Sequence, residues 1–265
     1  MKIENKFITF ENTKGQGAKE TNGKESNGKE TNGKESKAKD DKDFKKYTMK
    51  IRGKDKNVTA CILSYFKKVG YDHSNLSACS LEMKEQKNAF LFDNIHIRSL
   101  EDIVDAKEDV NAELIKEIML SSLNLLDTLE KYNLGLLNFD LADFIIIRIA
   151  EGCKIYSPVC FFIGFEKLFH LKNKSIEIMV PFKKGTFLAP EVRNIAALPA
   201  EIFNPIKASY YSAGLLAAFL TSNKKNLTTT EEFKDAVAPL LNTKVYWMIL
   251  RCLKKEPSDR YLLFI

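Results

Sequence analysis

The side chains most often used in metal sites or as nucleophiles are scattered along this chain of 265 residues. Its five cysteines lack the C-x-x-C spacing of zinc and redox sites, and its three histidines lack the H-E-x-x-H spacing of zinc proteases. No G-x-S-x-G nucleophile motif and no Walker phosphate-binding loop occurs. These patterns argue against metal, thiol and serine-hydrolase chemistry, and we interpret the cysteines as buried, reduced thiols.

Five short segments in the second half of the chain form an ordered series: LGLLNFDL (134–141), VCFFIGF (159–165), GTFLAPEV (185–192), YSAGLL (211–216) and CLKKEPSDR (252–260). In the same order they resemble the catalytic loop, the D-F-G segment, the A-P-E segment, the buried large-lobe helix and the C-terminal arginine segment of protein kinases. The resemblance covers residues 45–265. It implies an α+β, two-lobed protein-kinase-like fold with a reduced N-terminal lobe and a mainly helical C-terminal lobe.

Two residues match the catalytic machinery of that family. Asp140 resembles the aspartate that orients or deprotonates a substrate hydroxyl, and Lys50, within YTMK, resembles the small-lobe lysine that would hold the cofactor. ATP and Mg²⁺ would be the cofactors if the chain is active. A structural alternative stays open for both residues, with Asp140 capping its own loop and Lys50 as a solvated lysine at a strand end.

Several parts that phosphoryl transfer requires are replaced. No G-x-G-x-x-G cover occurs, and the helix expected over residues 57–69 offers no glutamate to orient Lys50. Ile163 stands where D-F-G begins, and isoleucine cannot ligate Mg²⁺, which takes oxygen ligands. Asp143 and Glu166 are the nearest acidic substitutes. We therefore expect no metal site and no cofactor, and a catalytically impaired protein.

Glu191 and Arg260 have a structural role in the kinase resemblance. In that family the glutamate of A-P-E pairs with the arginine near the C-terminus, and these two residues occupy the matching positions. Each charge needs its partner, because either one alone would be buried and unpaired. Only five residues follow Arg260, so we also expect the usual last helix to be trimmed, which would either weaken the large lobe or expose an apolar surface to a partner.

The periodicity of apolar residues predicts strands, then mostly helices. We expect strands over residues 6–11, 46–52, 76–83, 88–92, 144–149 and 159–162, and helices over 57–69, 99–104, 111–132, 209–220, 230–241 and 246–253. Asn57 and Ser99 are the expected helix N-caps. Trp247 is expected in the core. The two strands that precede the lysine strand in kinases are expected to be missing.

Residues 19–36 repeat every five residues as KETNG, KESNG, KETNG and KES. Such a segment has no apolar side chain to bury, so we expect disorder. The expected organisation is a disordered tail over residues 1–43, a reduced small lobe over 44–95 and a helical large lobe over 96–265.

Composition and charge argue against a nucleic-acid partner. The net charge of +6 is too small for a dedicated nucleic-acid binder. No secretion signal and no membrane span is evident, so we expect a cytoplasmic or nuclear protein. The sequence favours a pseudokinase that binds a protein partner or substrate; the alternatives are a divergent, active Ser/Thr-type protein kinase and a helical binding module with fortuitous kinase-like motifs.

Overall fold

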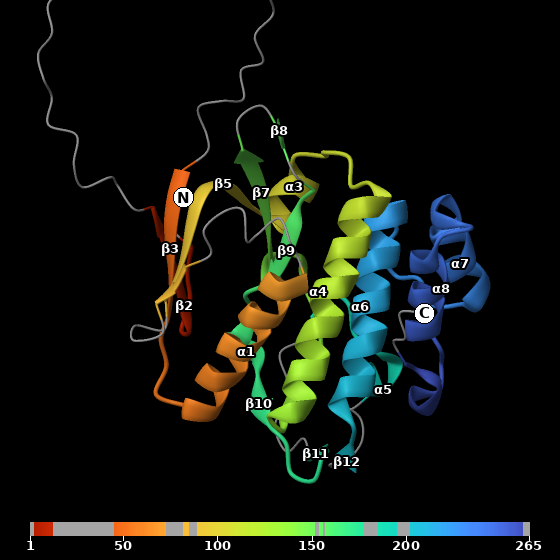
Figure 1. The fold of residues 1–265 in the computed structure, drawn as a ribbon. Coiled ribbons are helices and arrows are strands. Elements are labelled where there is room, and N and C mark those ends of the chain that lie inside the picture. Colours follow the sequence, from red (N-terminus) through yellow and green to blue (C-terminus); the bar gives the residue numbers. More distant parts are fainter. Residues whose placement is uncertain are drawn as a thin grey trace, which may run out of the picture.

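The computed structural model describes residues 3–12, 45–72, 82–84, 89–151, 154–155, 157–177, 185–194 and 202–261. Over these ranges the protein has a mixed α+β fold, in which an antiparallel sheet packs beside a group of helices (Figure 1). The α+β class predicted from the sequence is confirmed. The strands are β1 (Ile3–Glu4), β2 (Ile8–Asn12), β3 (Lys45–Ile51), β4 (Glu82–Lys84), β5 (Ala89–Ser99), β6 (Leu134–Gly135), β7 (Phe144–Glu151), β8 (Lys154–Ile155), β9 (Val159–Phe162), β10 (Phe169–His170), β11 (Ile176–Glu177) and β12 (Ile202–Phe203).

Strand β5 connects the two halves of the main sheet, whose order is β1-β2-β3-β5-β7-β8, with β4 paired to β5 and β9 to β7. Its first part, Ala89–Phe92, pairs with β3, and its last part, Ile95–Ser99, pairs with Ile149 back to Ile145 of β7. The segment expected to end as a strand at residue 92 therefore continues, because Ile95 and Ile97 lie two residues apart and are both buried.

Every helix except α5 begins after a polar capping residue. They are α1 (Lys56–Asp72), α3 (Leu100–Asp105), α4 (Ala112–Lys131), α5 (Pro190–Asn194), α6 (Pro205–Ser222), α7 (Thr230–Ala236) and α8 (Lys244–Cys252). Ser99 caps α3 as expected, with its side chain accepting a hydrogen bond from the Asp102 amide. The cap of α1 is Asp55 and not Asn57, because the Asp55 Oδ1 atom accepts hydrogen bonds from the amides of Asn57 and Val58.

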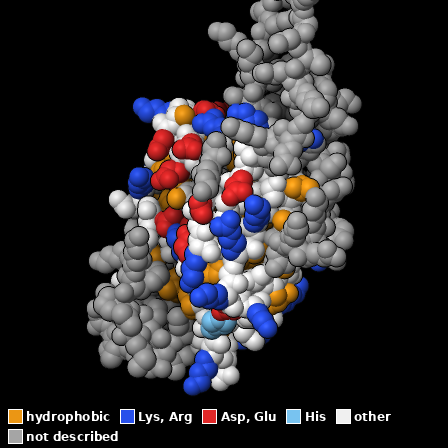
Figure 2. Space-filling model, turned by 90° about the vertical axis from the view of Figure 1, so that its left-hand side faces the viewer, with side chains coloured by type: hydrophobic (Ala, Val, Ile, Leu, Met, Phe, Trp, Pro, Cys, Tyr) orange, Lys and Arg blue, Asp and Glu red, His pale blue; other side chains and the backbone are white. Residues whose placement is uncertain are grey.

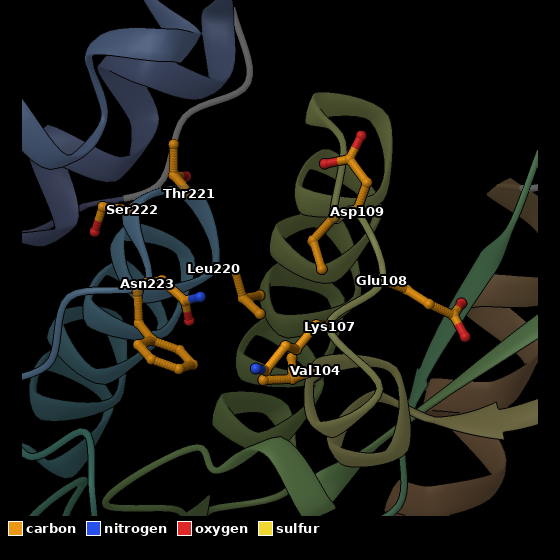
Figure 3. A pocket seen from close by; sticks show the side chains of 10 residues that line it. Val104, Lys107, Glu108, Asp109, Leu220, Thr221, Ser222 and Asn223 are labelled. Carbon is orange, nitrogen blue, oxygen red and sulfur yellow. The ribbon is translucent and has the colours of Figure 1, made fainter.

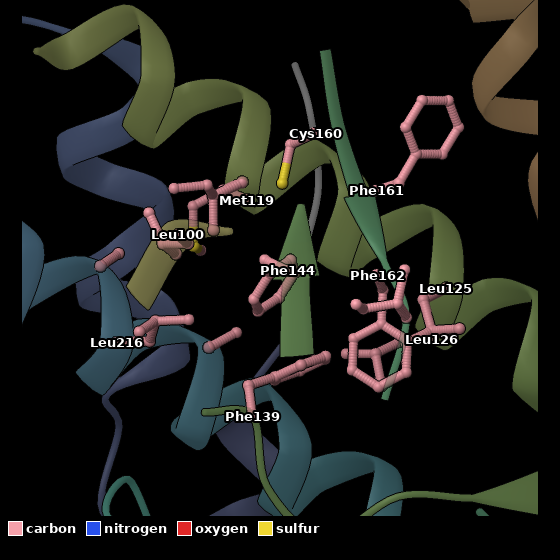
Figure 4. Close-up of a cluster of buried hydrophobic side chains, with 14 of the residues drawn as sticks. Leu100, Met119, Leu125, Leu126, Phe139, Phe144, Cys160, Phe161, Phe162 and Leu216 are labelled. Atoms are coloured by element: carbon pink, nitrogen blue, oxygen red, sulfur yellow. The ribbon is translucent and has the colours of Figure 1, made fainter. Parts of the chain in front are cut away.

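Aromatic side chains fill the space between α1, β9 and the short turn η4 (Phe165–Lys167). The Phe66 ring of α1 stacks on Phe161 with centroids 5.1 Å apart, and Phe165 meets the Phe162 ring edge-on at 5.2 Å. The Tyr65 hydroxyl accepts a hydrogen bond from the Phe162 amide. Figure 4 shows that this cluster continues from Phe161 and Phe162 toward Phe139 and Phe144. It holds η4 in place beside the loop that follows β6.

The structure corrects the expected N-terminal boundary. Residues 3–12 are not part of a tail, because β2 pairs with β3 from Ile8↔Ile51 to Asn12↔Tyr47 and buries Ile8 and Phe10. Two strands therefore precede β3: the strand expected over residues 6–11 corresponds to β2, and β1 was not expected. The alternating apolar residues of the segment determine this placement. The repeat and the rest of residues 13–44 lie outside the described residues.

Deleting two repeat units, residues 20–29, is expected to change the free energy of unfolding by less than about 0.5 kcal/mol. The repeat, which the sequence predicts to be disordered, lies between two paired strands, and the entropy of closing a disordered connection varies only with the logarithm of its length. Urea unfolding of the deleted and intact chains measures the difference. Ile8→Ala is the comparison, since removing a fully buried side chain from β2 should cost about 2–5 kcal/mol. If the deletion lowered the free energy of unfolding as much as Ile8→Ala does, the repeat would contribute to stability and this prediction would be wrong.

Candidate functional site

Two segments far apart in the sequence meet at Asp140. Its Oδ1 atom accepts a hydrogen bond from the backbone amide of Thr186 at 3.1 Å. Its Oδ2 atom accepts hydrogen bonds from Asn138 Nδ2 at 2.8 Å and from Lys167 Nζ at 2.9 Å. The loop LGLLNFDL and the segment GTFLAPEV are in contact here.

Asp143 completes the cluster from the next turn of the chain. It lies at the end of the short helix η3 (Leu141–Asp143), and its Oδ2 atom accepts hydrogen bonds from Lys167 Nζ at 2.6 Å and from the Asp140 amide at 2.7 Å. The Lys167 ammonium therefore bridges two carboxylates. The side chain of Asp143 is only 4% exposed, whereas those of Asp140 and Lys167 are 26% and 30% exposed.

Helix α6 fixes the loop that carries Asp140. The Ser212 hydroxyl accepts a hydrogen bond from the Phe139 amide at 2.8 Å, and the Ser209 hydroxyl donates to the Leu136 carbonyl. Both serines are buried in α6, so they satisfy polar backbone groups of a buried loop. Asp140 is thereby attached to α6, most of whose side chains are buried.

Two glycines allow the neighbouring segments to approach the cluster. A Cβ atom on Gly164 would lie 2.4 Å from Asp143 Oδ1, and one on Gly185 would lie 2.1 Å from Asn138 Nδ2. No side chain fits at either position without displacing the site. Gly164 belongs to the D-F-G match and Gly185 to the GTFLAPEV match, so each matched segment touches the cluster through a glycine.

The charges of the cluster depend on one another. Burial raises the pKa of Asp143 to about 6, although the Lys167 ammonium and the hydrogen bond from the Asp140 amide oppose this change. Burial acts to lower the pKa of Lys167, but its contacts with Asp143 and Asp140 outweigh this, and the net direction is upward. Lys167 therefore remains charged at neutral pH and neutralises part of the carboxylate pair.

Asp143→Asn is expected to flatten the pH dependence of stability between pH 4 and pH 6. The pKa of Asp143 is about 6 in the folded protein, against an ordinary value of 3.8, so the folded state binds more protons in this range than the unfolded chain. The wild type should then lose stability as the pH rises through it. Urea midpoints at pH 4.5, 5.5 and 7.5 measure the slope. Asp127→Asn is the control, since Lys131 and Lys68 lower the pKa of the exposed Asp127, the opposite direction from the change at Asp143. Equal slopes in the wild type and Asp143→Asn would contradict the assignment.

The N-terminal turn covers the residue that stands where D-F-G begins. Asn5, in the turn between β1 and β2, donates a hydrogen bond from Nδ2 to the Ile163 carbonyl at 2.7 Å. The Ile163 amide in turn donates to the Asp143 carbonyl at 2.7 Å, and the Ile163 side chain is buried. Phe7, beside Asn5, is also buried. The position that the kinase resemblance assigns to a metal ligand is thus packed with apolar and backbone atoms.

Lys50 is not brought to Asp140. Tyr47, Met49 and Ile51 of β3 are buried, so Lys50 lies on the opposite face of the strand, where it forms an exposed ion pair with Glu11 at 2.9 Å. Figure 2 views this side of the molecule and shows acidic and basic side chains interspersed. The cofactor-binding role considered for Lys50 is not supported, because strand alternation points its side chain away from the helices.

Glu191 and Arg260 are in contact. Arg260 is fully buried and uses both Nη atoms on the carboxylate, with Nη2 lying 3.0 Å from Glu191 Oε2. Its remaining N–H groups donate to the carbonyls of Lys254, Lys255 and Lys207 at 2.7, 2.7 and 3.2 Å. All five guanidinium donors are satisfied. The pair ties α5 to the segment after α8.

The residues at Asp140 do not fit the Mg²⁺ site of a kinase. Lys167 is bound to both carboxylates, and Ile163 offers no oxygen ligand from its side chain. Within the described ranges there is no group of three or more histidine, cysteine, aspartate or glutamate residues placed to hold a metal ion. Glu166, considered as a substitute ligand, is exposed on η4.

A pocket of about 450 Å³ lies elsewhere, between the turn after α3 and the C-terminal end of α6 (Figure 3). Val104, Lys107 and Asp109 line one side, and Leu220 and Asn223 line the other. It includes no residue of the Asp140 cluster. The cluster itself is a compact set of ionic and hydrogen-bonded contacts.

Lys167 is the main residue of the site that sequence reasoning missed. It lies 27 positions after Asp140, outside every matched motif, and only the antiparallel pairing of β7 with β9 brings the two regions together. No spacing rule for such a pair could have identified it. The strand predictions over 144–149 and 159–162 are the only information in the sequence that favours this proximity.

Comparison with known proteins identifies no family. No protein-family model matches the chain, and a search of curated proteins found no relative. None of the helices in the described part of the chain is both long and apolar enough to cross a membrane.

Proposed function

We propose that this protein is a pseudokinase: a catalytically impaired, two-lobed protein-kinase-like protein that acts as a scaffold or regulator by binding another protein. The single observation that carries the proposal is the Lys167 ammonium bridging Asp140 and Asp143. Phosphoryl transfer depends on metal ions that bridge the phosphates and neutralise the developing charge. Here an internal cation is bound to the carboxylates instead.

Three further contacts support the impaired chemistry. Asn5 and buried Ile163 pack the position where a metal ligand would stand. Lys50 pairs with Glu11 on the outer face of the sheet. The backbone of Ile95–Ser99, which connects the proposed lobes, is paired with β7 as a strand. A bound nucleotide would need part of the space at Ile163, the Lys50 side chain and the backbone groups of Ile95–Ser99.

Other contacts support a retained scaffold. Glu191 meets Arg260, as the kinase resemblance suggests, and Thr186 of the GTFLAPEV segment also meets Asp140. A protein that keeps such long-range contacts while its chemical groups are replaced presents a stable surface to a partner. The buried free cysteines Cys61, Cys160 and Cys252 fit the proposed cytoplasmic or nuclear location.

An active Ser/Thr-type protein kinase is the second candidate, and one observation favours it. Asp140 and Lys167 are each about a quarter to a third exposed, so a substrate hydroxyl could reach Asp140 Oδ1 if the Lys167 side chain turned toward a phosphate. ATP and Mg²⁺ would then be the cofactors, bound by groups other than Lys50.

A phosphoryl-transfer assay distinguishes the two functions. The full chain is incubated with radiolabelled ATP, Mg²⁺ or Mn²⁺ and general protein substrates, beside Asp140→Ala. The pseudokinase proposal predicts the same background incorporation for both proteins. Incorporation by the wild type that Asp140→Ala abolishes would falsify it and establish the active kinase.

A further inference from the structure

The exposed large apolar side chains of the described residues gather at one end of the protein. They are Leu241, Trp247 and Tyr261, which lie just before, on and after α8. Trp247 is 58% exposed, which corrects its expected place in the core. The buried face of α8 is formed instead by residues such as Met248 and Ile249, and Trp247 points away from it.

Trp247 and Tyr261 belong to one surface together with basic residues. Trp247 and Arg251 are separated by one helical turn, and the Arg251 guanidinium lies 5.5 Å from the centre of the Tyr261 ring. The Tyr246 ring supports Trp247 edge-on at 5.0 Å. Lys244 begins the helix on the same side, since it precedes Trp247 by three residues. We name Lys244, Trp247, Arg251 and Tyr261 the α8 surface.

The charge around the α8 surface is basic. Residues 241–261 contain five lysines and arginines and two acidic residues. Arg260 is buried against Glu191, but Lys244, Lys254 and Lys255 are exposed and Arg251 is half-buried. Glu256 and Asp259 are the two acids, so a basic excess remains at the surface. Such a surface attracts an acidic segment and repels a basic one.

The α8 surface is held rigidly. Gly214 of α6 lies so close to α8 that an added Cβ atom would be 2.9 Å from Cys252 Cβ. Cys252 and Ile249 are fully buried, and Thr243 caps the helix through the Tyr246 amide at 3.2 Å. Aromatic and arginine side chains on a rigid element lose little freedom on binding, and these residue types dominate the energetics of protein interfaces.

We infer that the α8 surface is the docking site for an acidic protein segment that carries a large apolar anchor. The anchor packs beside Trp247 and Tyr261, and its flanking carboxylates face Lys244 and Arg251. The inference rests on the proposed function, because it names the class of partner and the surface that a kinase-like scaffold would use. It does not involve Asp140.

Trp247 is the only tryptophan of the chain, so its fluorescence reports directly on the α8 surface. The full chain is titrated with three short amphipathic peptides: one with leucine and phenylalanine along one face and glutamate elsewhere, a second with lysine replacing glutamate, and a third with serine replacing the apolar residues. The first peptide is expected to shift the emission to shorter wavelength and to bind at least about tenfold more tightly than the others.

The variant Lys244→Glu/Arg251→Glu keeps the fluorophore and is expected to lose about tenfold or more in affinity for the acidic peptide. Its circular dichroism and melting temperature are compared with the wild type to check that the fold is kept.

Equal binding of all three peptides, or no emission shift with any, would overturn the inference. Emission that changes with protein concentration alone would show a second copy on this surface and would also overturn it. A red shift on deleting residues 262–265 would overturn it too, because the chain itself would be the occupant. None of these outcomes changes the phosphoryl-transfer assay, so the two proposals can fail separately.

Discussion

Arg260→Met is expected to destabilise the protein by about 3–5 kcal/mol, the usual cost of breaking a buried ion pair from one side. The change leaves the Glu191 carboxylate without its cation and removes the donors to the carbonyls of Lys254, Lys255 and Lys207. The Arg260 guanidinium also lies 4.7 Å from the centre of the Tyr211 ring, so packing against α6 is lost. Urea unfolding with circular dichroism measures the change in free energy.

Two comparisons make this prediction specific. Arg52→Met breaks an exposed ion pair with Glu4, at 3.6 Å, and should cost about 1 kcal/mol or less. The double variant Glu191→Gln/Arg260→Met removes the unpaired carboxylate, so its loss should be smaller than the sum of the two single losses. A cost for Arg260→Met no larger than that for Arg52→Met would mean that the buried pair does not hold α5 to the C-terminal segment.

Lys167→Met is expected to cost about 3 kcal/mol at pH 8 and much less at pH 5. Without the ammonium, the buried Asp143 carboxylate faces Asp140 with no cation to compensate, which raises its pKa above the value of about 6 in the wild type. At pH 8 the variant must either keep a buried charge or take up a proton, and both are costly. At pH 5 Asp143 is largely protonated in both proteins, so the difference between them shrinks.

Lys174→Met is the matched control for Lys167→Met. Lys174 forms an exposed ion pair with Glu130 at 3.3 Å, and its removal should cost well under about 1 kcal/mol at either pH. Unfolding of all three proteins is measured at pH 5 and pH 8. A loss in Lys167→Met that is equal at the two pH values would contradict the bridging role, because it would show that the charge of Asp143 does not matter.

The elements with a regular apolar period could be predicted from the sequence. The helix expected over residues 111–132 is α4, Ala112–Lys131, with Asn111 as its N-cap, because its apolar side chains recur at helical spacing over five turns. The strands expected over 144–149 and 159–162 are within β7 and β9. Helix α7 ends at Ala236, short of the expected residue 241, because Pro239 follows and cannot donate within a helix.

The misjudged features depend on contacts between distant parts of the chain. Residues 3–12 are short and precede a repeat, and only their pairing with β3 makes them part of the sheet. Trp247 is apolar, but α8 already buries another face against α6, so the ring remains outside. The sequence around Lys167 indicates an ordinary surface lysine. In the folded protein η4 places its ammonium between two carboxylates. Local periodicity contains none of this information.

Thermal unfolding of the full chain with ATP, in the presence of Mg²⁺ or of EDTA, tests the central claim most directly. A ligand at a hundredfold excess over its dissociation constant stabilises a protein by about 2.7 kcal/mol, which shifts the midpoint of a domain of this size by several degrees. We predict no Mg²⁺-dependent rise, because Lys167 occupies the carboxylates of Asp140 and Asp143. A rise of several degrees that requires Mg²⁺ and is lost in Asp140→Ala would contradict the account and favour an active kinase.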